Sequence, residues 1–260
     1  MHVAELFSLK DKVAAVVGGT GVLGATFCRG LADVGASVAV LGRSAERGAA
    51  VVAELERSGH PATAVTLDAT DRQQIQTAER SIVERFGGVD ILVNAAGINS
   101  TTPFLEIKED EWHRILDTNL TSTMLTCQVF GQGMIARDRG GCVVNVSSDS
   151  SEIPLSKVLT YGVSKAGVNN LTRYLARELA PHRIRVNALV PGFFPAEQNR
   201  RILAPERVQA ILQHTPMGRL GEPEELVGAL VWLASERAAG FVTGALICVD
   251  GASAWKLLGG

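Results

Sequence analysis

The sequence has no long apolar run, no run of basic residues and few aromatic side chains, and each absence argues against a class of protein. No apolar stretch approaches the roughly 18 residues that a membrane-spanning helix needs. Aromatic residues make up 5% of the chain and the formal net charge is −2, so a nucleic-acid-binding role has no electrostatic support. The first residues lack a basic stretch followed by an apolar one. We therefore expect no signal peptide and a cytoplasmic location.

Cysteine is also scarce, and its placement predicts neither disulfides nor a metal site. The four cysteines are scattered and form no Cys-x-x-Cys pair: Cys28, Cys127, Cys142 and Cys248. We expect them to be small buried apolar residues in a reducing compartment. No cluster of His, Cys, Asp or Glu suggests a metal ligand set.

What the chain does contain is a long alternation of apolar runs and helix-period segments. Strands are expected at Val13–Val17, Ser37–Leu41, Ala62–Leu67, Ile91–Val93, Cys142–Val146, Arg185–Leu189 and Ala245–Val249. Helices are expected near 22–34, 44–58, 71–86, 109–137, 158–180 and 223–235. Because the strands are apolar throughout, they should be buried on both faces of a parallel sheet. The sequence thus predicts an α/β, doubly wound fold, with residues 1–260 forming a single domain.

One region departs from this alternation. Between about 190 and 221, prolines and glycines interrupt a short helical patch. We expect a substrate lid at about 193–220, and the alternative is an ordinary surface excursion.

A glycine-rich turn follows the first expected strand. Val13–Val17 runs straight into Gly18-Gly19-Thr20-Gly21-Val22-Leu23-Gly24, after which a helical pattern begins. Glycines allow a tight turn and a close approach of the backbone, and a helix N-terminus presents free N–H groups to a diphosphate. This arrangement predicts a dinucleotide site, the alternative being a purely structural turn.

The end of the second strand bears on which dinucleotide is bound. A free ribose 2′-hydroxyl is usually met by Asp or Glu about 20 residues past the glycines. That position holds Gly42, with Arg43 next. A guanidinium can hold a 2′-phosphate that a carboxylate would repel, so NADP(H) is favoured and NAD(H) stays possible. Alternatively, Arg43 is a solvated residue beside a helix cap at Ser44.

Tyr161 and Lys165 lie four residues apart in an expected helix, about 13 residues after Ser148. This spacing places them on one helix face, where an ammonium can lower the pKa of a phenol from its ordinary value near 10. A hydroxyl from Ser148 could hold a substrate oxygen beside that phenol. The set suits general acid–base chemistry on an alcohol/carbonyl pair, although such a pair alone also arises by chance.

Together with Asn94-Ala95-Ala96-Gly97, these motifs resemble the short-chain dehydrogenase/reductase family, in order and spacing, from about Leu9 to Gly251. The resemblance implies a Rossmann-type sheet of seven parallel strands flanked by helices, a nicotinamide cofactor and a homotetramer or homodimer. It places the catalytic serine on Ser148 rather than Ser147, and adds Asn119 to Tyr161 and Lys165 as a catalytic residue.

The resemblance also implies a set of cofactor-binding residues. Asp68 matches the residue that meets the adenine amine, and Pro191-Gly192 matches the turn beside the nicotinamide. The full expected set is Gly18, Thr20, Gly21, Val22, Leu23, Gly24, Arg43, Asp68, Asn94, Ala95, Ala96, Gly97, Tyr161, Lys165, Pro191 and Gly192. The chain departs from the family pattern at Val22, Ala95, Ala196 and Ala252, none of them in the catalytic set.

A narrower resemblance concerns the substrate. The glycine turn, residues 191–200 and residues 215–219 look like the branch that interconverts D-mannonate and D-fructuronate. A sugar-acid substrate is therefore expected, with a positive group near the lid. Arg200 is the first candidate for that group, followed by Arg201 and Lys157, and each could instead be a solvated charge. The expected substrate residues are Ser150, Phe194, Asn199 and Arg200.

Three classes of function remain open. The first is an NAD(P)-dependent oxidoreductase that interconverts a secondary alcohol and a ketone on a sugar acid or polyol. The second is a reductase of 3-oxoacyl thioesters or apolar ketones, suggested by Phe193, Phe194, Ile153 and Leu155. The third is a non-catalytic dinucleotide sensor. A small-molecule substrate is expected in the first two classes, with no nucleic-acid or membrane partner.

Overall fold

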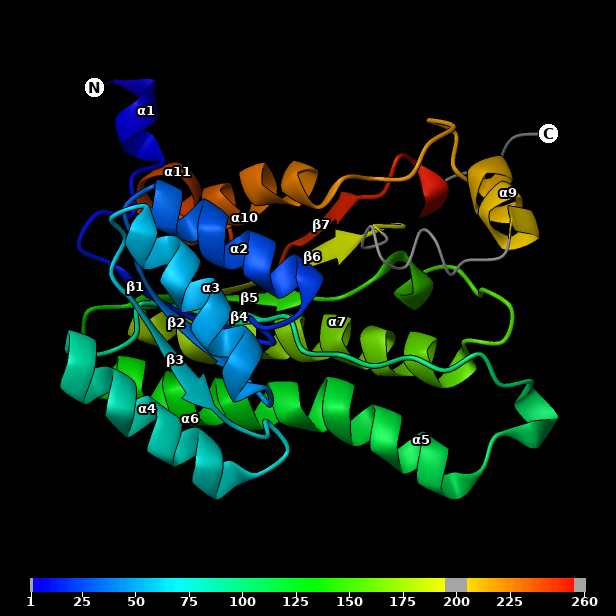
Figure 1. The fold of residues 1–260 in the computed structure, drawn as a ribbon, viewed down its shortest axis with the longest axis horizontal. Helices are drawn as coiled ribbons and strands as arrows, with labels where there is room; N and C mark the ends of the chain where they lie inside the picture. Colours follow the sequence, from blue (N-terminus) through cyan, green and yellow to red (C-terminus); the bar gives the residue numbers. More distant parts are fainter. Residues whose placement is uncertain (1, 195–204, 255–260) are drawn as a thin grey trace.

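The structure, a computed structural model, describes residues 2–194 and 205–254. Its centre is one sheet of seven parallel strands in the order β3-β2-β1-β4-β5-β6-β7, with helices on both faces (Figure 1). The predicted fold class is confirmed. The strands are β1 Val13–Val17, β2 Ser37–Gly42, β3 Ala62–Thr66, β4 Ile91–Asn94, β5 Gly141–Val146, β6 Ile184–Pro191 and β7 Leu246–Val249.

The helices match the predicted segments closely, with several short additions. The α-helices are α1 Val3–Leu6, α2 Val22–Asp33, α3 Ala45–Arg57, α4 Arg72–Phe86, α5 Glu109–Leu116, α6 Ser122–Arg137, α7 Leu159–Leu179, α9 Pro205–His214, α10 Val227–Ala234 and α11 Glu236–Ala239. Single 3₁₀ turns lie at η1 Phe104–Glu106, η3 Asp149–Ser151, η4 Ala180–His182 and η5 Pro223–Leu226. No helix in these described parts is long and apolar enough to cross a membrane.

The predicted helix at 109–137 is not continuous. A π-helical turn, η2 Asp117–Thr121, separates α5 from α6. Such turns insert one extra residue into a helix and are frequent at functional sites. Periodicity cannot reveal this turn, because the polar residues Asp117, Thr118 and Asn119 are compatible with an ordinary helix.

The central strands are buried on both faces, because two separate apolar layers cover the sheet. Alternate residues of β1 point to opposite faces: Ala14 and Val16 pack with α2, α3 and α10, whereas Ala15 and Val17 pack with α4, α6 and α7. Phe27 of α2 anchors the first layer, and Phe130 of α6 anchors the second.

The edge strands differ from the prediction of burial on both faces. Only Ala62 of the five β3 residues is buried, and no β7 residue is. An edge strand has a neighbour on one side only, and the covering helices reach it less completely. Cys248 of β7 is consequently exposed, so the expectation that all four cysteines are buried is wrong for this one.

The parallel direction of the strands determines where a site can form. Gly18 after β1, Ala95 after β4, Ser147 after β5 and Gly192 after β6 all lie at the carboxyl edge of the sheet. Chain order reverses between β1 and β4, which are neighbours in the sheet although β2 and β3 lie between them in sequence. In open α/β sheets, ligands bind outside the strand ends at such a switch point.

Candidate active site

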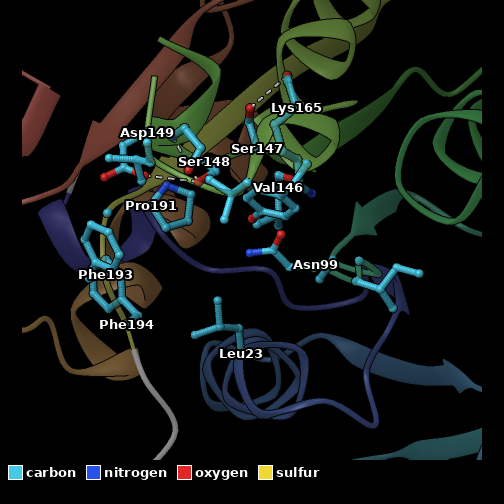
Figure 2. A pocket seen from close by; sticks show the side chains of 18 of the residues that line it. Leu23, Asn99, Val146, Ser147, Ser148, Asp149, Lys165, Pro191, Phe193 and Phe194 are labelled. Carbon is cyan, nitrogen blue, oxygen red and sulfur yellow. Dashed lines mark hydrogen bonds between the residues drawn. The ribbon is translucent and has the colours of Figure 1, made fainter. Parts of the chain in front are cut away.

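A cavity of about 530 Å³ opens at the carboxyl edge of the sheet. Ser148, Tyr161 and Lys165 all line it, together with the turn Pro191–Gly192 and the apolar side chains of Phe193 and Phe194. Figure 2 shows the two phenylalanine rings grouped on one side of Ser148 and Asp149, with Leu23 and Asn99 contributed by other segments. The structure thus brings together three of the four residues for which catalysis was predicted.

Ser148 is the second residue after β5 and is held by short-range hydrogen bonds. Its Oγ accepts from Ser150 N at 3.2 Å, which caps η3, and donates to Asp149 Oδ1 at 3.1 Å. Ser148 is also the hydroxyl whose hydrogen bonding lowers the pKa of Tyr161. Ser147 Oγ, in contrast, donates to the Lys165 backbone oxygen at 3.2 Å. The hydroxyl that acts on the phenol is therefore that of Ser148, and its catalytic role stays a prediction.

Lys165 is fully buried on α7, one helical turn after Tyr161. Its Nζ donates to Val146 O at 2.7 Å and lies 5.7 Å from the centre of the Tyr161 ring. Burial lowers the pKa of Lys165 to about 8, because desolvation penalises the charged ammonium.

Burial also governs the phenol. Desolvation raises the pKa of Tyr161, the hydrogen bond from Ser148 lowers it, and the charge of Asp149 raises it. The downward shift expected from the sequence is not found. Lys165 directs its hydrogen bond to Val146 O, and desolvation of the phenol outweighs the help of Ser148.

Asn119 lies in the π-helical turn and does not line the cavity. Its Oδ1 accepts from Ile98 N at 2.8 Å, while its Nδ2 donates to Ile98 O at 2.9 Å and to Ser164 Oγ at 3.0 Å. The amide therefore fastens the segment after β4 to α7, close to Lys165. Its proposed catalytic role stays a prediction.

A second groove of about 520 Å³ continues from the cavity along the same edge of the sheet. It shares Ala95, Gly97 and Ile98 with the cavity. Its other lining residues include predicted cofactor residues, namely Gly18, Thr20, Gly21, Arg43, Asp68 and Ala96. The two hollows form one path from the glycine turn to Tyr161.

The glycine turn fits a dinucleotide diphosphate. Gly21, which lines the groove, is the N-cap of α2, and no side chain caps this N-terminus. The first N–H groups of the helix are therefore available to a diphosphate. Gly18 has φ +82°, and a Cβ there would come within 2.8 Å of the Ala95 carbonyl carbon. Only glycine allows the turn to approach the segment after β4 this closely.

Not every predicted cofactor residue lines the two hollows. Leu23, Pro191, Gly192, Tyr161 and Lys165 line the cavity, whereas Val22, Gly24 and Asn94 line neither. Val22 is exposed in the first turn of α2, and Gly24 packs against the Gly18 backbone. Asn94 is buried, donating to Asn145 Oδ1 at 2.9 Å and accepting from Thr126 Oγ1 at 2.8 Å, so its side chain joins β4 to its neighbours.

Gly42, at the position where Asp or Glu usually meets the ribose hydroxyl, has no room for a side chain. A Cβ on Gly42 would come within 2.9 Å of Thr20 Cγ2 and closer still to its hydroxyl. Thr20 therefore occupies the space that an Asp side chain would need. Arg43 and Arg47 line the groove beside it; Arg47 was not predicted, although it lies only four residues after Arg43, in the first turn of α3.

The predicted substrate residues divide in two. Ser150 and Phe194 line the cavity. Asn199 and Arg200, like Arg201, lie outside the described residues. Lys157 is exposed and is absent from the described lining of the cavity. The lid expected at 193–220 is represented by Phe193 and Phe194, by α9 and by residues 215–220.

Replacing Gly18 by alanine should weaken both the fold and dinucleotide binding. The left-handed backbone costs about 1 kcal/mol for alanine, and contact with the Ala95 and Ala96 backbone adds about 1–3 kcal/mol. Chemical denaturation and fluorescence titration with NADPH measure the two effects. Gly59→Ala is the matched control, since Gly59 has φ +84° with nothing within 4 Å. Equal losses in both variants would contradict the close-approach explanation.

Comparison with known proteins agrees with this geometry. The family model described as "Enoyl-(Acyl carrier protein) reductase" matches residues 20–252. The chain is 36% identical to the 5-keto-D-gluconate 5-reductase of Escherichia coli (strain K12), over 95% of this chain and 97% of the relative.

Two solved structures are similar over nearly their whole length, each with a TM-score of 0.92 and 32% identity, covering 97% of this chain and 98% of theirs. One is a gluconate 5-dehydrogenase from Burkholderia cenocepacia J2315 in complex with NADP and tartrate. The other is described as a putative D-mannonate oxidoreductase from Haemophilus influenza with bound NAD. The chain belongs to the short-chain dehydrogenase/reductase family and is an NAD(P)-dependent oxidoreductase acting on CH–OH groups.

Proposed function

We propose that this oxidoreductase interconverts a secondary alcohol and a ketone on a sugar acid of the gluconate or D-mannonate/D-fructuronate kind. The observation that carries the proposal is the cavity in which the Ser148 hydroxyl, the Tyr161 phenol and the Lys165 ammonium meet at the end of the dinucleotide groove. The names of the similar proteins support the choice of substrate class.

The cofactor is held by the groove residues. The N–H groups at the start of α2 would bind the diphosphate, Asp68 would meet the adenine, and Pro191–Gly192 would lie beside the nicotinamide. Asp68 is suited to accept a hydrogen bond because its pKa is lowered, chiefly by hydrogen bonds from the Thr70 N–H and hydroxyl. When bound, the nicotinamide supplies or accepts the hydride at the substrate carbon.

The chain's own residues handle the proton. In reduction, Tyr161 donates its phenolic proton to the substrate oxygen, and Ser148 fixes that oxygen beside the phenol. Lys165, when protonated, stabilises the phenolate that this step leaves behind. In alcohol oxidation the same phenolate accepts the hydroxyl proton. Asn119 supports the proton return by holding the segment after β4 against α7.

NADP(H) is the preferred cofactor in this proposal. Gly42 carries no carboxylate, and Arg43 and Arg47 give the groove two guanidinium groups at the end of β2. A guanidinium can bind a 2′-phosphate bidentately, while a ribose hydroxyl gains little from it.

Arg43→Ala should therefore raise the Kd for NADPH by about 10- to 100-fold and leave the Kd for NADH nearly unchanged, because a charge-assisted hydrogen bond contributes about 1.5–3 kcal/mol. Fluorescence titration of each nucleotide measures this. Arg57→Ala, an exposed arginine at the other end of α3, is the control and should change neither. An equal loss for both nucleotides would show that Arg43 does not read the phosphate.

The substrate is tested by a panel. Oxidation of NADPH and NADH is followed with 5-ketogluconate, fructuronate, acetoacetyl thioesters and apolar ketones. We expect kcat/KM at least about tenfold higher for one of the two sugar acids, since a polar substrate matched to its site is distinguished strongly from an analogue without its hydroxyls. Higher values for the thioesters would replace the proposal by the 3-oxoacyl reductase alternative, which the apolar wall of Phe193, Phe194 and Leu155 favours. Dinucleotide binding without turnover of any of these compounds would revive the sensor.

The substrate carboxylate needs a cation, and among the described lining residues of the cavity only Lys165 is basic. Arg200 and Arg201, predicted for this role, lie outside the described residues, so their role stays a prediction from the sequence. We also propose that residues 1–260 act as one domain with a lid at about 193–220, in the cytoplasm, as a homotetramer or homodimer. Sedimentation equilibrium measures the assembly.

A further inference from the structure

The carboxylate of Asp149 is buried directly behind the Ser148 hydroxyl, and neither the sequence motifs nor the proton transfer described above uses it. Asp149 is 2% exposed and lies in the first position of η3. Buried carboxylates are rare unless they are paired with a cation or hydrogen-bonded. In the described parts of the chain no basic side chain forms an ion pair with it.

Two hydroxyl groups replace the missing cation. Asp149 Oδ1 accepts from Ser148 Oγ at 3.1 Å, and Oδ2 accepts from Ser253 Oγ at 2.9 Å (Figure 2 shows Asp149 beside Ser148). Ser253 is 3% exposed and belongs to the turn after β7, where its Oγ is also 3.4 Å from Asp250 Oδ2. Asp149 thus connects Ser148 to the turn after β7 through two buried hydrogen bonds.

These hydrogen bonds determine where the single hydroxyl proton of Ser148 lies. A serine hydroxyl has a single donor and two acceptor lone pairs. Because the Ser148 proton points to Asp149 and one lone pair accepts from Ser150 N, Asp149 competes with the Tyr161 phenolate for the one hydrogen bond by which Ser148 would lower the pKa of Tyr161. The arrangement therefore favours a protonated Tyr161.

The charge of Asp149 itself acts in the same direction, since it raises the pKa of Tyr161. Around Asp149 lie Asp250 and Cys248 from the β7 segment, Glu152 from its own loop, and Tyr161 and Lys165 from α7. Burial raises the pKa of Asp149, while the hydrogen bonds from Ser253 and Ser148 lower it. Lys165 is the one cation among these groups, and its hydrogen bond goes to Val146 O rather than to a carboxylate.

We propose that Asp149 is a positioning residue that takes the Ser148 proton and uses its negative charge to keep Tyr161 protonated to higher pH, which sets the enzyme's working range toward carbonyl reduction. The proposal rests on the proposed function for its catalytic consequence. The electrostatic coupling between the buried carboxylate and the phenol does not depend on substrate and is present in the free protein.

The coupling can be measured directly because the chain has only two tyrosines. Tyr174→Phe, at an exposed position of α7, leaves Tyr161 as the single tyrosine. Its ionisation is followed in the free protein by the ultraviolet absorbance of phenolate and by the ¹³Cζ shift of labelled tyrosine. In this background, Asp149→Asn keeps a hydrogen-bond acceptor beside Ser148 and removes the charge. We expect the Tyr161 titration to move to lower pH by about half a pH unit or more, because the variant lacks the negative charge that opposes ionisation of the buried phenol.

Asp250→Asn is the matched control. Asp250 is also acidic and near the same turn, but its carboxylate accepts from Ala252 N and Ala254 N and makes no bond to Ser148. The Tyr161 titration should stay in place in this variant. An unchanged titration in Asp149→Asn, or an equal shift in both variants, overturns the proposal.

A second measurement connects the coupling to turnover. In Asp149→Asn the alkaline limit of ketone reduction and the acid limit of alcohol oxidation should both move to lower pH, by the same amount as the Tyr161 titration. A uniform loss of rate with unmoved limits would show a merely structural role. If Asp149→Asn does not fold, Asp149→Ser removes the same charge with a smaller side chain, and its Tyr161 titration is compared with that of the Tyr174→Phe protein in the same way. Because the spectroscopic titration needs no substrate, a wrong substrate class leaves this test intact.

Discussion

Tyr161→Phe should lower kcat by about 10²- to 10⁴-fold, which is the range that a positioned general acid contributes. Phenylalanine keeps the ring against Lys165 and removes only the hydroxyl that forms the hydrogen bond with Ser148. Binding of NADPH should change by less than about threefold, since the dinucleotide groove is formed mainly by other residues. Steady-state kinetics with the best substrate of the panel and a fluorescence titration measure the two quantities.

The chain supplies its own control for this variant. Tyr174 lies on the same helix, is 63% exposed and is absent from the lining of the cavity. Tyr174→Phe makes the same chemical change and should keep kcat within about twofold, as expected of a surface substitution away from any site. Near-normal turnover in Tyr161→Phe would remove the phenol from the mechanism.

The pH dependence of the wild-type enzyme follows from the same group. Burial raises the pKa of Tyr161, so the phenol stays protonated through neutral pH. Ketone reduction, which needs the protonated form, should persist across that range and fall only at alkaline pH. Alcohol oxidation, which needs the phenolate, should rise as the pH approaches the tyrosine pKa.

The central strands and the site they position could be predicted from the sequence because burial on both faces leaves a strong pattern. β1, with five apolar residues in a row, lies at the predicted residues, and β4 and β5 differ from prediction by one residue each. Their carboxyl ends carry the glycine turn, Asn94–Gly97 and Ser148, and a parallel sheet brings such ends together regardless of their separation in sequence. The resemblance to the family, through its distance from serine to tyrosine, also separated Ser148 from Ser147.

Other features depend on contacts between distant segments, which no local pattern records. Ser253 meets Asp149 across more than a hundred residues of chain, so the buried carboxylate could not be recognised as part of the site. Thr20 fills the space beside Gly42, which explains the missing acidic residue only once β1 and β2 are paired. The pKa of Tyr161 was misjudged for a related reason, because its dominant cause is burial by the tertiary structure rather than the lysine four residues on.

Lys165→Met should abolish most of the activity and yet stabilise the protein at neutral pH. Lys165 is 4% exposed, with a single hydrogen bond to Val146 O. Burial lowers its pKa from 10.5 to about 8, so protonating this lysine costs the folded state about 3 kcal/mol at pH 7. In the variant, the unpaired Val146 carbonyl lowers the free energy of unfolding by about 1–2 kcal/mol, which offsets part of the gain from removing the charge. We therefore expect a net rise of about 1–2 kcal/mol in the free energy of unfolding.

The sign of the pH dependence makes this prediction specific. A lysine whose pKa is lower in the folded state binds fewer protons there, so the wild type gains stability as pH rises from about 8 to 10.5 and carries the full penalty below pH 8. The methionine variant lacks this titration, whereas ionisation of Tyr161 affects both proteins and largely cancels in their difference. Urea unfolding at pH 7 and pH 10 measures the change, with exposed Lys10→Met as the control. A stability difference that does not change between the two pH values would mean that Lys165 is not desolvated. It would also contradict the idea that a buried ammonium at this position stabilises the phenolate of Tyr161.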